Sequence, residues 1–403
     1  MQQSPENTSW PRAFTFFLAG VSVAFLVGKA SSTLPLLRTE LGLSLFQAGL
    51  VVSIFNLISG CMGVVFGAFA DRFGHARIAV SGLLTAALGS FIGAYAESPA
   101  LLLSSRVIEG LGFFLATVST PPLLLRVAAQ SDRQKVMGLW GAYMPTGTAI
   151  MMLAGGILAV SIGWRGIWLL SGALILVVAG LVWMAARIGA PKAGPRGGSV
   201  VTRGSLLQVM RHRGSLLLAL MFGAYAGQYL SITAFIPLIL VENGGWSLAA
   251  AGTAGAGIIA VNIIGNLFSG VVLDSGISRK AAIIFATCAM MIGAFLVMSD
   301  IFPIWVRSAG GVLFSGVGGL IPGALFSGVA YHAPSPGLIS TVNGLMMQGS
   351  SFGQVALPFM VSALVSATGQ WYSALYITMP AACAVIWAAI NIGRLEISTT
   401  SVR

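Results

Sequence analysis

Four ionisable side chains lie within long apolar stretches of the sequence, where they could do chemistry that a surface charge could not. They are Lys29, Arg106, Glu109 and Arg307. A charge among apolar residues is costly, so it is kept mainly where it binds or moves something charged. Glu109 follows Arg106 by three residues, a spacing that puts both side chains on one face of a helix. The four groups therefore predict a charged site among apolar segments.

The charges of this set do not cancel. Three cations and one acid leave an excess of two positive charges, which a dry site does not tolerate. An anionic ligand would neutralise that excess, and the guanidinium groups of Arg106 and Arg307 could each hold it with two parallel hydrogen bonds. We therefore expect Lys29, Arg106 and Arg307 to bind a small anion. Glu109 is the only acid of the set. We expect it to carry a proton whose movement is coupled to that of the anion.

The composition shows that the surroundings of these groups are a lipid bilayer. The chain has 403 residues, of which 57% are hydrophobic and only 8% are charged, against roughly 25% charged residues in soluble domains. So few charges cannot cover a water-soluble globule of this length, and the same figures exclude a disordered, collagen-like or disulfide-scaffold protein. Cys61, Cys288 and Cys383 lie in apolar runs and have no metal-binding spacing. The chain is therefore expected to be an all-α membrane protein.

The lengths of the apolar runs predict how often the chain crosses the bilayer, because one crossing takes about 20 residues. Barrel strands are shorter and alternate in polarity, which these runs do not. The sequence predicts twelve transmembrane helices, at 13–36, 45–70, 78–95, 100–125, 136–160, 166–186, 215–240, 248–273, 281–299, 304–329, 339–365 and 373–392. These group into six-helix bundles at 13–186 and 215–392, a basic linker at 187–214, and tails at 1–12 and 393–403.

The placement of Lys and Arg predicts the orientation of these helices. With both termini inside, sixteen of the 21 Lys and Arg residues fall in inner segments, and only Arg38 and Arg165 fall in outer loops. This bias is typical of a multi-pass protein of a bacterial inner membrane with cytoplasmic termini. It also accounts for the net charge of +11 without nucleic acid as a partner. The inner patches would at most contact anionic lipid.

The buried charges also have structural interpretations. Arg106 and Glu109 could simply neutralise each other as an ion pair. Lys29 lies roughly 10 Å below the outer end of its helix, at 1.5 Å per residue, and Arg307 lies nearer to a helix end. Either side chain could therefore extend its charge to the membrane interface.

The two halves of the sequence repeat each other at an offset of 201 to 206 residues. The matching pairs include Pro35 with Pro237, Gly49 with Gly252, Asp71 with Asp274, Arg77 with Lys280, Arg106 with Arg307, Gly110 with Gly311, Pro121 with Pro322, and Gly147 with Gly353. Ordered matches of Pro and charged residues are rare by chance. Two parallel six-helix repeats around one axis are typical of transporters that bind a solute between the halves.

Two motifs resemble, and a third partly resembles, those of a known family, the major facilitator superfamily. Gly67-Ala-Phe-Ala-Asp71-Arg72-Phe-Gly74-His75-Ala-Arg77 resembles the signature of its second loop, with His75 where Arg or Lys is commoner. Arg106-Val-Ile-Glu109-Gly110-Leu-Gly112 resembles its fourth-helix arginine motif, and Gly141-Ala-Tyr-Met-Pro145-Thr-Gly147 partly resembles the fifth-helix motif of its antiporters. The residues around Gly138 are most similar to those of cyanate/nitroimidazole-type permeases.

The resemblance implies that helices 1, 4, 7 and 10 line a central cavity, where the ionisable groups would converge. Neutral side chains on helices 5, 7 and 11 are further candidates for substrate contact, namely Tyr143, Tyr225, Gln228, Tyr229 and Gln348. The family's second loop locks the halves at the inner face, with an acid set against a helix N-terminus. The resemblance therefore implies gating roles for Gly67, Asp71, Arg72, Gly74, Arg77 and Asp274; ordinary solvation of these loops is the alternative.

The sequence thus predicts a secondary transporter that works by alternating access. We expect proton-coupled symport of a small anion; the alternative is a proton antiporter that exports a drug, siderophore or other amphipathic compound. A channel or a receptor is a further class, against which the internal repeat argues. We expect no enzymatic activity, cofactor or metal, because no phosphate-binding loop and no His/Cys cluster occurs. The expected partners are the anion, protons and lipid, and the chain is expected to be a monomer.

Overall fold

The computed structural model of the protein describes residues 7–57, 74–187, 203–329, 331–335 and 338–400, and every regular element in these ranges is a helix. The first half contains α1 (Trp10–Leu41), α2 (Leu45–Ser53), η1 (Ile54–Asn56), α4 (His75–Ala94), α5 (Pro99–Val127), η2 (Gln130–Asp132), α6 (Arg133–Gly141) and α7 (Tyr143–Arg187). The second half contains α8 (Arg203–Arg211), α9 (Arg213–Thr233), α10 (Ile236–Glu242), α11 (Leu248–Asp274), α12 (Arg279–Met298), α13 (Ile304–Gly318), α14 (Leu320–Gly328), α15 (Ile339–Thr368), η4 (Trp371–Ala374) and α16 (Leu375–Thr400).

Serine side chains begin four of the apolar helices. Ser44, Ser98, Ser247 and Ser278 each accept a hydrogen bond from the backbone N–H three residues later. These contacts satisfy N–H groups that have no partner within the helix. The helix starts are therefore set locally, by a short polar turn before each apolar run.

Helix α7 contains two of the predicted spans in one 45-residue element. At 1.5 Å per residue it would be about 68 Å long, more than twice the hydrocarbon thickness of a bilayer. Its backbone turns at Gly163, where φ is 68°, a conformation that residues other than glycine avoid. Within the described ranges, ten helices are long and apolar enough to span a membrane, and Leu45–Asn56 is a shorter apolar one. With α7 counted twice these make eleven, and Leu45–Asn56 is the described part of the predicted span 45–70. The predicted all-α membrane fold is therefore confirmed.

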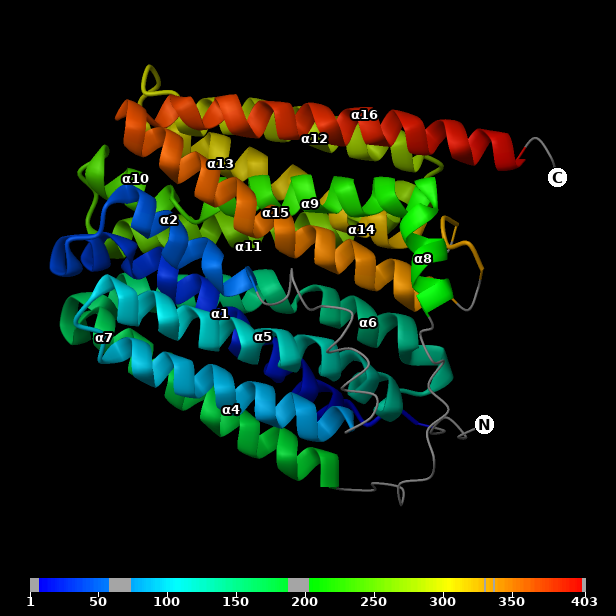
Figure 1. Cartoon of the computed structure of the whole chain (residues 1–403), viewed down its shortest axis with the longest axis horizontal. Coiled ribbons are helices and arrows are strands. Elements are labelled where there is room, and N and C mark those ends of the chain that lie inside the picture. Colours follow the sequence, from blue (N-terminus) through cyan, green and yellow to red (C-terminus); the bar gives the residue numbers. More distant parts are fainter. Residues whose placement is uncertain (1–6, 58–73, 188–202, 330, 336–337, 401–403) are drawn as a thin grey trace.

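The helices run roughly parallel in two groups (Figure 1). Helices α4 to α7 lie on one side and α9 to α16 on the other, with α1 between them, and both chain termini lie at one end. We call this end the terminal end and the opposite one the distal end. The predicted linker 187–214 lies partly outside the described residues and includes the short helix α8.

Contacts at two glycines reproduce the internal repeat in three dimensions. A Cβ atom added to Gly147 would lie 2.1 Å from the carbonyl oxygen of Val21, so α7 lies directly against α1. A Cβ atom on Gly353 would lie 1.9 Å from the carbonyl oxygen of Gly223, so α15 lies against α9 in the same way. The matched glycines of the sequence thus occupy equivalent places in the two halves.

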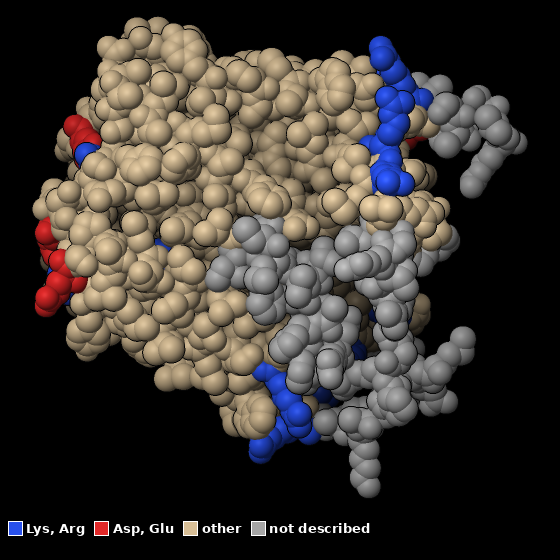
Figure 2. Space-filling view, in the orientation of Figure 1, with Lys and Arg blue, Asp and Glu red and all other residues tan. Residues whose placement is uncertain are grey.

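Lys and Arg side chains gather at the terminal end, where Asp132, Asp274 and Glu396 also lie, and acidic side chains are visible at the distal end (Figure 2). The described Lys and Arg residues near the terminal end are Arg12, Arg77, Arg126, Arg133, Lys135, Arg187, Arg211, Arg213, Arg279, Lys280 and Arg394. Glu40, Glu97, Glu242 and Asp300 lie at the distal end. Between these ends the visible face is uncharged over most of its length, as a surface in contact with lipid must be.

Candidate functional site

Three of the four predicted ionisable groups meet inside the first half of the protein. Glu109 lies at the centre, with its Oε1 atom 2.5 Å from the Lys29 Nζ atom and its Oε2 atom paired with the Arg106 Nη1 atom. The Ser90 hydroxyl also donates to Oε1, at 2.8 Å. All three charged side chains have an exposed fraction of 0%. We call Lys29, Arg106 and Glu109 the charge cluster.

Every donor position of the Lys29 ammonium group has a partner. Its Nζ atom donates to Glu109 at 2.5 Å, to the Ser90 hydroxyl at 2.7 Å and to the Ser171 hydroxyl at 3.1 Å. It also lies 3.9 Å from the ring centre of Trp168, a cation–π distance. Lys29 thus points away from the second half, into the space between α4, α5 and α7.

Arg106 uses three of its five N–H groups within the first half. Its Nε atom donates to the carbonyl oxygen of Val51 at 2.9 Å, and its Nη1 atom donates to the carbonyl oxygen of Leu26 at 3.0 Å and to Glu109. Its Nη2 atom is buried without a partner among the described residues. Arg106 therefore ties α5 to α1 and α2 and keeps one polar atom unsatisfied.

A glycine lets a neighbouring helix approach the charge cluster closely. A Cβ atom on Gly89 of α4 would lie 2.7 Å from the Glu109 Cγ atom. The neighbouring Ser90 supplies the hydroxyl between Lys29 and Glu109. Sequence reasoning did not select Ser90, Ser171 or Trp168, because an isolated Ser or Trp in an apolar run carries no functional signal by itself.

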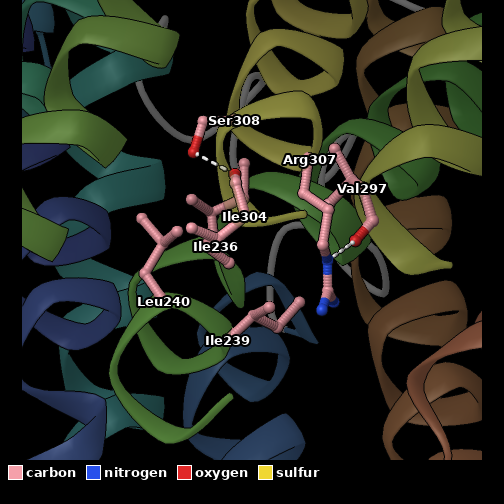
Figure 3. A pocket seen from close by; sticks show the side chains of 7 residues that line it. All are labelled: Ile236, Ile239, Leu240, Val297, Ile304, Arg307 and Ser308. Carbon is pink, nitrogen blue, oxygen red and sulfur yellow. Dashed lines mark hydrogen bonds between the residues drawn. The ribbon is translucent and has the colours of Figure 1, made fainter. Parts of the chain in front are cut away.

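The structure places Arg307 in a separate environment, on α13 beside α10 and Val297 (Figure 3). Its Nε atom donates to the carbonyl oxygen of Val297 at 2.8 Å, and its Nη1 atom lies 2.9 Å from an Asp300 carboxylate oxygen. A small cavity of about 10 Å³ adjoins it, lined by apolar residues of α10 and α13 together with Val297 and Ser308. Arg106 and Arg307 do not converge on one point in this structure.

The pairing of Arg307 with Asp300 corrects the charge count made from the sequence. Asp300 lies in a turn, outside the apolar runs, so it did not enter that count. With Arg307 neutralised by Asp300, the excess belongs to the charge cluster alone and is one positive charge. The anion expectation therefore has a weaker electrostatic basis than the sequence implied.

Two of the predicted substrate contacts on α9, Tyr225 and Tyr229, form an aromatic row within the second half. Tyr225 lies 5.9 Å from Tyr229 between ring centres, and Tyr229 stacks on Phe314 at 6.1 Å. The Tyr229 hydroxyl lies 3.0 Å from the Ser315 hydroxyl, and the Asn262 amide contacts the Tyr225 hydroxyl at 3.5 Å. These tyrosines thus join α9 to α11 and α13.

The other neutral candidates lie apart from that row. Tyr143 stacks on Trp140 at 4.3 Å, where α6 meets α7 in the first half. Gln228 is buried and donates to the carbonyl oxygen of Ala224 in its own helix, whereas Gln348 is partly buried on α15. The structure holds no ligand, so contact between any of these residues and a substrate stays a prediction.

The two halves touch each other toward the distal end. Helix α2 lies against α15, α7 against α11, and α1 against α10. The Arg38 guanidinium of α1 forms an ion pair with Glu242 of α10, and both side chains are partly exposed. These contacts close the molecule at this end.

A pocket of about 300 Å³ lies between the halves, where α2 and η1 face α15. Its lining residues are Leu50, Ser53, Ile54, Leu57, Val355, Ala356 and Phe359, and none of them is charged. The Ser53 hydroxyl is buried and has no hydrogen-bond partner among the described residues. The volume is at the lower bound for sites that bind small organic molecules. We call it the interhalf pocket.

Half of the predicted gating residues fall outside the described part of the chain, namely Gly67, Asp71 and Arg72. Gly74 precedes α4 with a φ of 96°, which explains the need for glycine there. Arg77 is exposed in the first turn of α4, and Asp274 is exposed at the end of α11. Their gating roles stay predictions.

A twelve-helix bundle built from two repeats, with an uncharged lateral face and ionisable groups inside, defines a multi-pass membrane transporter fold. The sequence profile of the Major Facilitator Superfamily matches residues 13–358. The chain belongs to this superfamily, as its motifs implied.

Relatives in sequence include named drug-resistance proteins. The chain is 27% identical to the quinolone resistance protein NorB of Staphylococcus aureus over a segment of 239 residues. This segment covers 58% of the chain and 48% of that protein. The chain is 29% identical to the puromycin resistance protein pur8 of Streptomyces alboniger over 166 residues. This segment covers 40% of the chain and 33% of that protein. The matches thus span about half or less of these relatives.

Solved structures share the fold over nearly the whole chain. A bacterial homologue of the human lysosomal transporter Spinster, in an inward-facing and occupied conformation, has a TM-score of 0.72 at 18% identity, with 96% of this chain and 94% of that chain covered. A D-xylose–proton symporter has a TM-score of 0.72 at 16% identity, with coverages of 94% and 96%. At these identities the likeness concerns the fold alone.

Proposed function

We propose that this transporter is a proton-coupled antiporter that exports an amphipathic organic compound. The observation that carries the proposal is the interhalf pocket, which is uncharged, largely apolar and placed between the two halves. Binding between the halves is what alternating access requires. The sequence likeness to proteins named for quinolone and puromycin resistance supports the same substrate class.

The charge cluster is the proposed coupling centre. It is the only group of ionised side chains that the described spans enclose at 0% exposure, and ionisable groups so placed typically serve proton movement. It does not line the interhalf pocket, so substrate and proton would act on different surfaces of the first half. The cluster residues lie on α1 and α5. The coupling of export to proton movement would therefore act through the packing of these two helices.

The proposed orientation places the terminal end in the cytoplasm of a bacterial cell. The support is the excess of Lys and Arg over acids at that end, which is typical of the cytoplasmic side. Impermeant maleimide labelling of Asn243→Cys and Arg394→Cys in whole cells tests it. Labelling of the first position only is expected, and labelling of the second only would reverse the orientation.

Proton-coupled symport of a small anion is the second candidate. It is favoured by the excess positive charge of the cluster and by the buried Arg106 Nη2 atom, which has no partner among the described residues. Binding there would require the helices around Arg106 to separate. The Arg106 guanidinium makes its three hydrogen bonds through Nε and Nη1. Its Nη2 atom could therefore bind an anion while these contacts remain.

Flux in proteoliposomes distinguishes the two candidates. Vesicles with an imposed pH gradient are loaded with norfloxacin, puromycin or benzoate, and substrate and proton flows are recorded together. Opposite flows of protons and of an amphipathic compound are expected. Parallel flow of benzoate and protons would establish the second candidate, and ion flow at channel rates would reject both.

A further inference from the structure

The charge cluster keeps an unbalanced positive charge at a place without solvent exposure. Lys29 and Arg106 contribute two positive charges and Glu109 one negative charge, and all three side chains are fully buried. Around Lys29, the charged groups that face it are Glu109 and Arg106, both from α5. Helices α4 and α7 contribute only Ser90, Ser171 and Trp168 to its contacts among the described residues.

Only one protonation change removes this excess. The Arg106 guanidinium stays charged at any pH at which a protein is folded. Protonation of Glu109 would raise the excess to two charges and would weaken its contacts with both cations. Loss of a proton from Lys29 brings the net charge of the cluster to zero. Because an uncompensated buried charge is costly, this is the direction that dehydration favours.

The hydrogen bonds around Lys29 can accommodate a neutral amine. A neutral Nζ atom has two N–H donors and one lone pair, so Glu109 and Ser90 can keep accepting from it. The lone pair needs a donor, and the Ser171 Oγ atom lies 3.1 Å away. This hydroxyl now donates to the carbonyl oxygen of Trp168 at 2.9 Å and can rotate toward Nζ. The charged form instead has the Trp168 ring as a cation–π partner.

We propose that Lys29 is the group that releases and takes up the coupled proton. One N–H bond of the ammonium breaks, its electron pair stays on Nζ, and the proton passes to water that enters when α1 separates from its neighbours. Glu109 stays ionised and positions Lys29. The sequence-based expectation gave the proton to Glu109. The present assignment rests on the proposed function and names the proton carrier within the same cluster.

The first half alone is built for this role. At the repeat offset of 202 found for Pro35 and Pro237, the counterpart of Lys29 is Ser231, whose hydroxyl donates to its own helix. At the offset of 201 found for Arg106 and Arg307, the counterpart of Glu109 is Gly310. The counterparts of Lys29 and Glu109 in the second half are therefore uncharged.

Lys29 is also close to the contact that closes the distal end. Ser32 lies one turn further along α1, and a Cβ atom on Gly155 would lie 2.0 Å from its hydroxyl oxygen. The next residue, Gly156, contacts Gly252 of the second half. A change of charge at Lys29 alters how α1 packs against α5. Because α1 also packs against α7, which carries Gly155 and Gly156, the change reaches the contact that closes the distal end.

Lysine-selective NMR of the purified full chain tests the assignment without any substrate. The chain has four lysines, Lys29, Lys135, Lys192 and Lys280. With ¹³C at Cε, a signal that is absent in Lys29→Met is expected to move from the ammonium to the amine position between mildly acidic and mildly alkaline buffer. The other three signals serve as internal controls and stay at the ammonium position.

A second variant keeps the test valid if Lys29→Met does not fold. Replacement of Lys135, Lys192 and Lys280 by Arg leaves Lys29 as the only labelled lysine. A Lys29 signal that stays at the ammonium position over the whole range would overturn the assignment. Because no transport is measured, a negative flux result with a titrating Lys29 would reject the proposed function and leave the assignment of this group intact.

Discussion

Gly156 of α7 and Gly252 of α11 meet across the two halves, so closely that a Cβ atom on Gly156 would lie 2.8 Å from the Gly252 Cα atom. The same contact occurs a second time. Gly252 corresponds in the repeat to Gly49, and a Cβ atom on Gly49 would lie 1.9 Å from the hydroxyl oxygen of Ser362, the counterpart of Gly156 at an offset of 206. Two equivalent close contacts therefore hold the distal end shut.

A larger side chain at Gly156 should open this end. Gly156→Leu places atoms where the α11 backbone lies, and overpacking of this kind typically costs about 1–3 kcal/mol. The closed form should lose that stability relative to the open one. Maleimide labelling of Ser53→Cys, in a chain whose native cysteines are replaced by Ala, should become several-fold faster. Gly180→Leu on the same helix has open space around it and should leave the rate unchanged; equal rates in both variants would contradict the closure.

The ion pair between Arg38 and Glu242 should contribute much less to this closure. Both side chains are partly exposed, at 24% and 40%, and exposed pairs are worth about 0–1 kcal/mol. Arg38→Glu should therefore increase the labelling rate of Ser53→Cys by no more than about fivefold. The exchanged pair Arg38→Glu with Glu242→Arg should restore the parent rate. A loss of closure as large as that of Gly156→Leu would show that the pair is a main lock.

Removal of Glu109 should destabilise the protein strongly. Glu109→Gln leaves Lys29 and Arg106 buried without their counter-ion, and breaking a buried pair in this way costs about 3–5 kcal/mol. Thermal unfolding in detergent should shift to markedly lower temperature, whereas Glu97→Gln, at an exposed position, should have no effect. Adding Lys29→Met to Glu109→Gln should recover part of the loss. A Glu109→Gln variant as stable as the parent would contradict the description of the cluster.

The stability of the terminal end should depend on the protonation of His332. This side chain lies in the loop after α14, where its Nε2 atom is 3.0 Å from a Glu396 oxygen. Burial, and then the positive charge of Arg279 and the neighbouring His212, lower the pKa of His332 to about 4 from 6.5. Glu396 also pairs with Arg279, which already balances its charge. The folded chain therefore holds His332 neutral.

The sign of the pH effect follows from that pKa. Between pH 6.5 and about 4 the unfolded chain binds a proton at His332 that the folded chain does not. The free energy of unfolding should thus decrease as the pH is lowered through this range. His332→Gln should flatten the decrease in the unfolding temperature, and His75→Gln, outside this cluster, should not. An identical pH profile for parent and His332→Gln would contradict the prediction.

Filling the interhalf pocket should stop transport without unfolding the protein. Ala356→Trp places an indole in a space of about 300 Å³ that Ala356 itself lines. Flux of the transported compound should fall by an order of magnitude or more, because the indole takes the volume of the substrate. Leu267→Trp on α11, where the side chain is 64% exposed, should transport normally. Normal flux in Ala356→Trp would place the substrate elsewhere.

The sequence by itself determined the membrane fold, because hydropathy and helix length are properties of single segments. Apolar runs near 20 residues can cross a bilayer only as helices when they do not alternate in polarity. The repeat, visible as Gly147 with Gly353, also predicted which helices correspond. Glu109 could be placed beside Arg106, since both lie on one helix at a spacing of three.

Tertiary structure decided what each charge is paired with, because a partner on another element leaves no mark at a fixed distance in the sequence. Lys29 reaches Glu109 across 80 positions, Ser90 across 61 and Ser171 across 142. Arg307 pairs with Asp300, whereas Arg106, its counterpart in the repeat, pairs with Glu109. A helix rotation of a few tens of degrees would exchange such partners while leaving every apolar run intact, and only side-chain packing fixes that rotation.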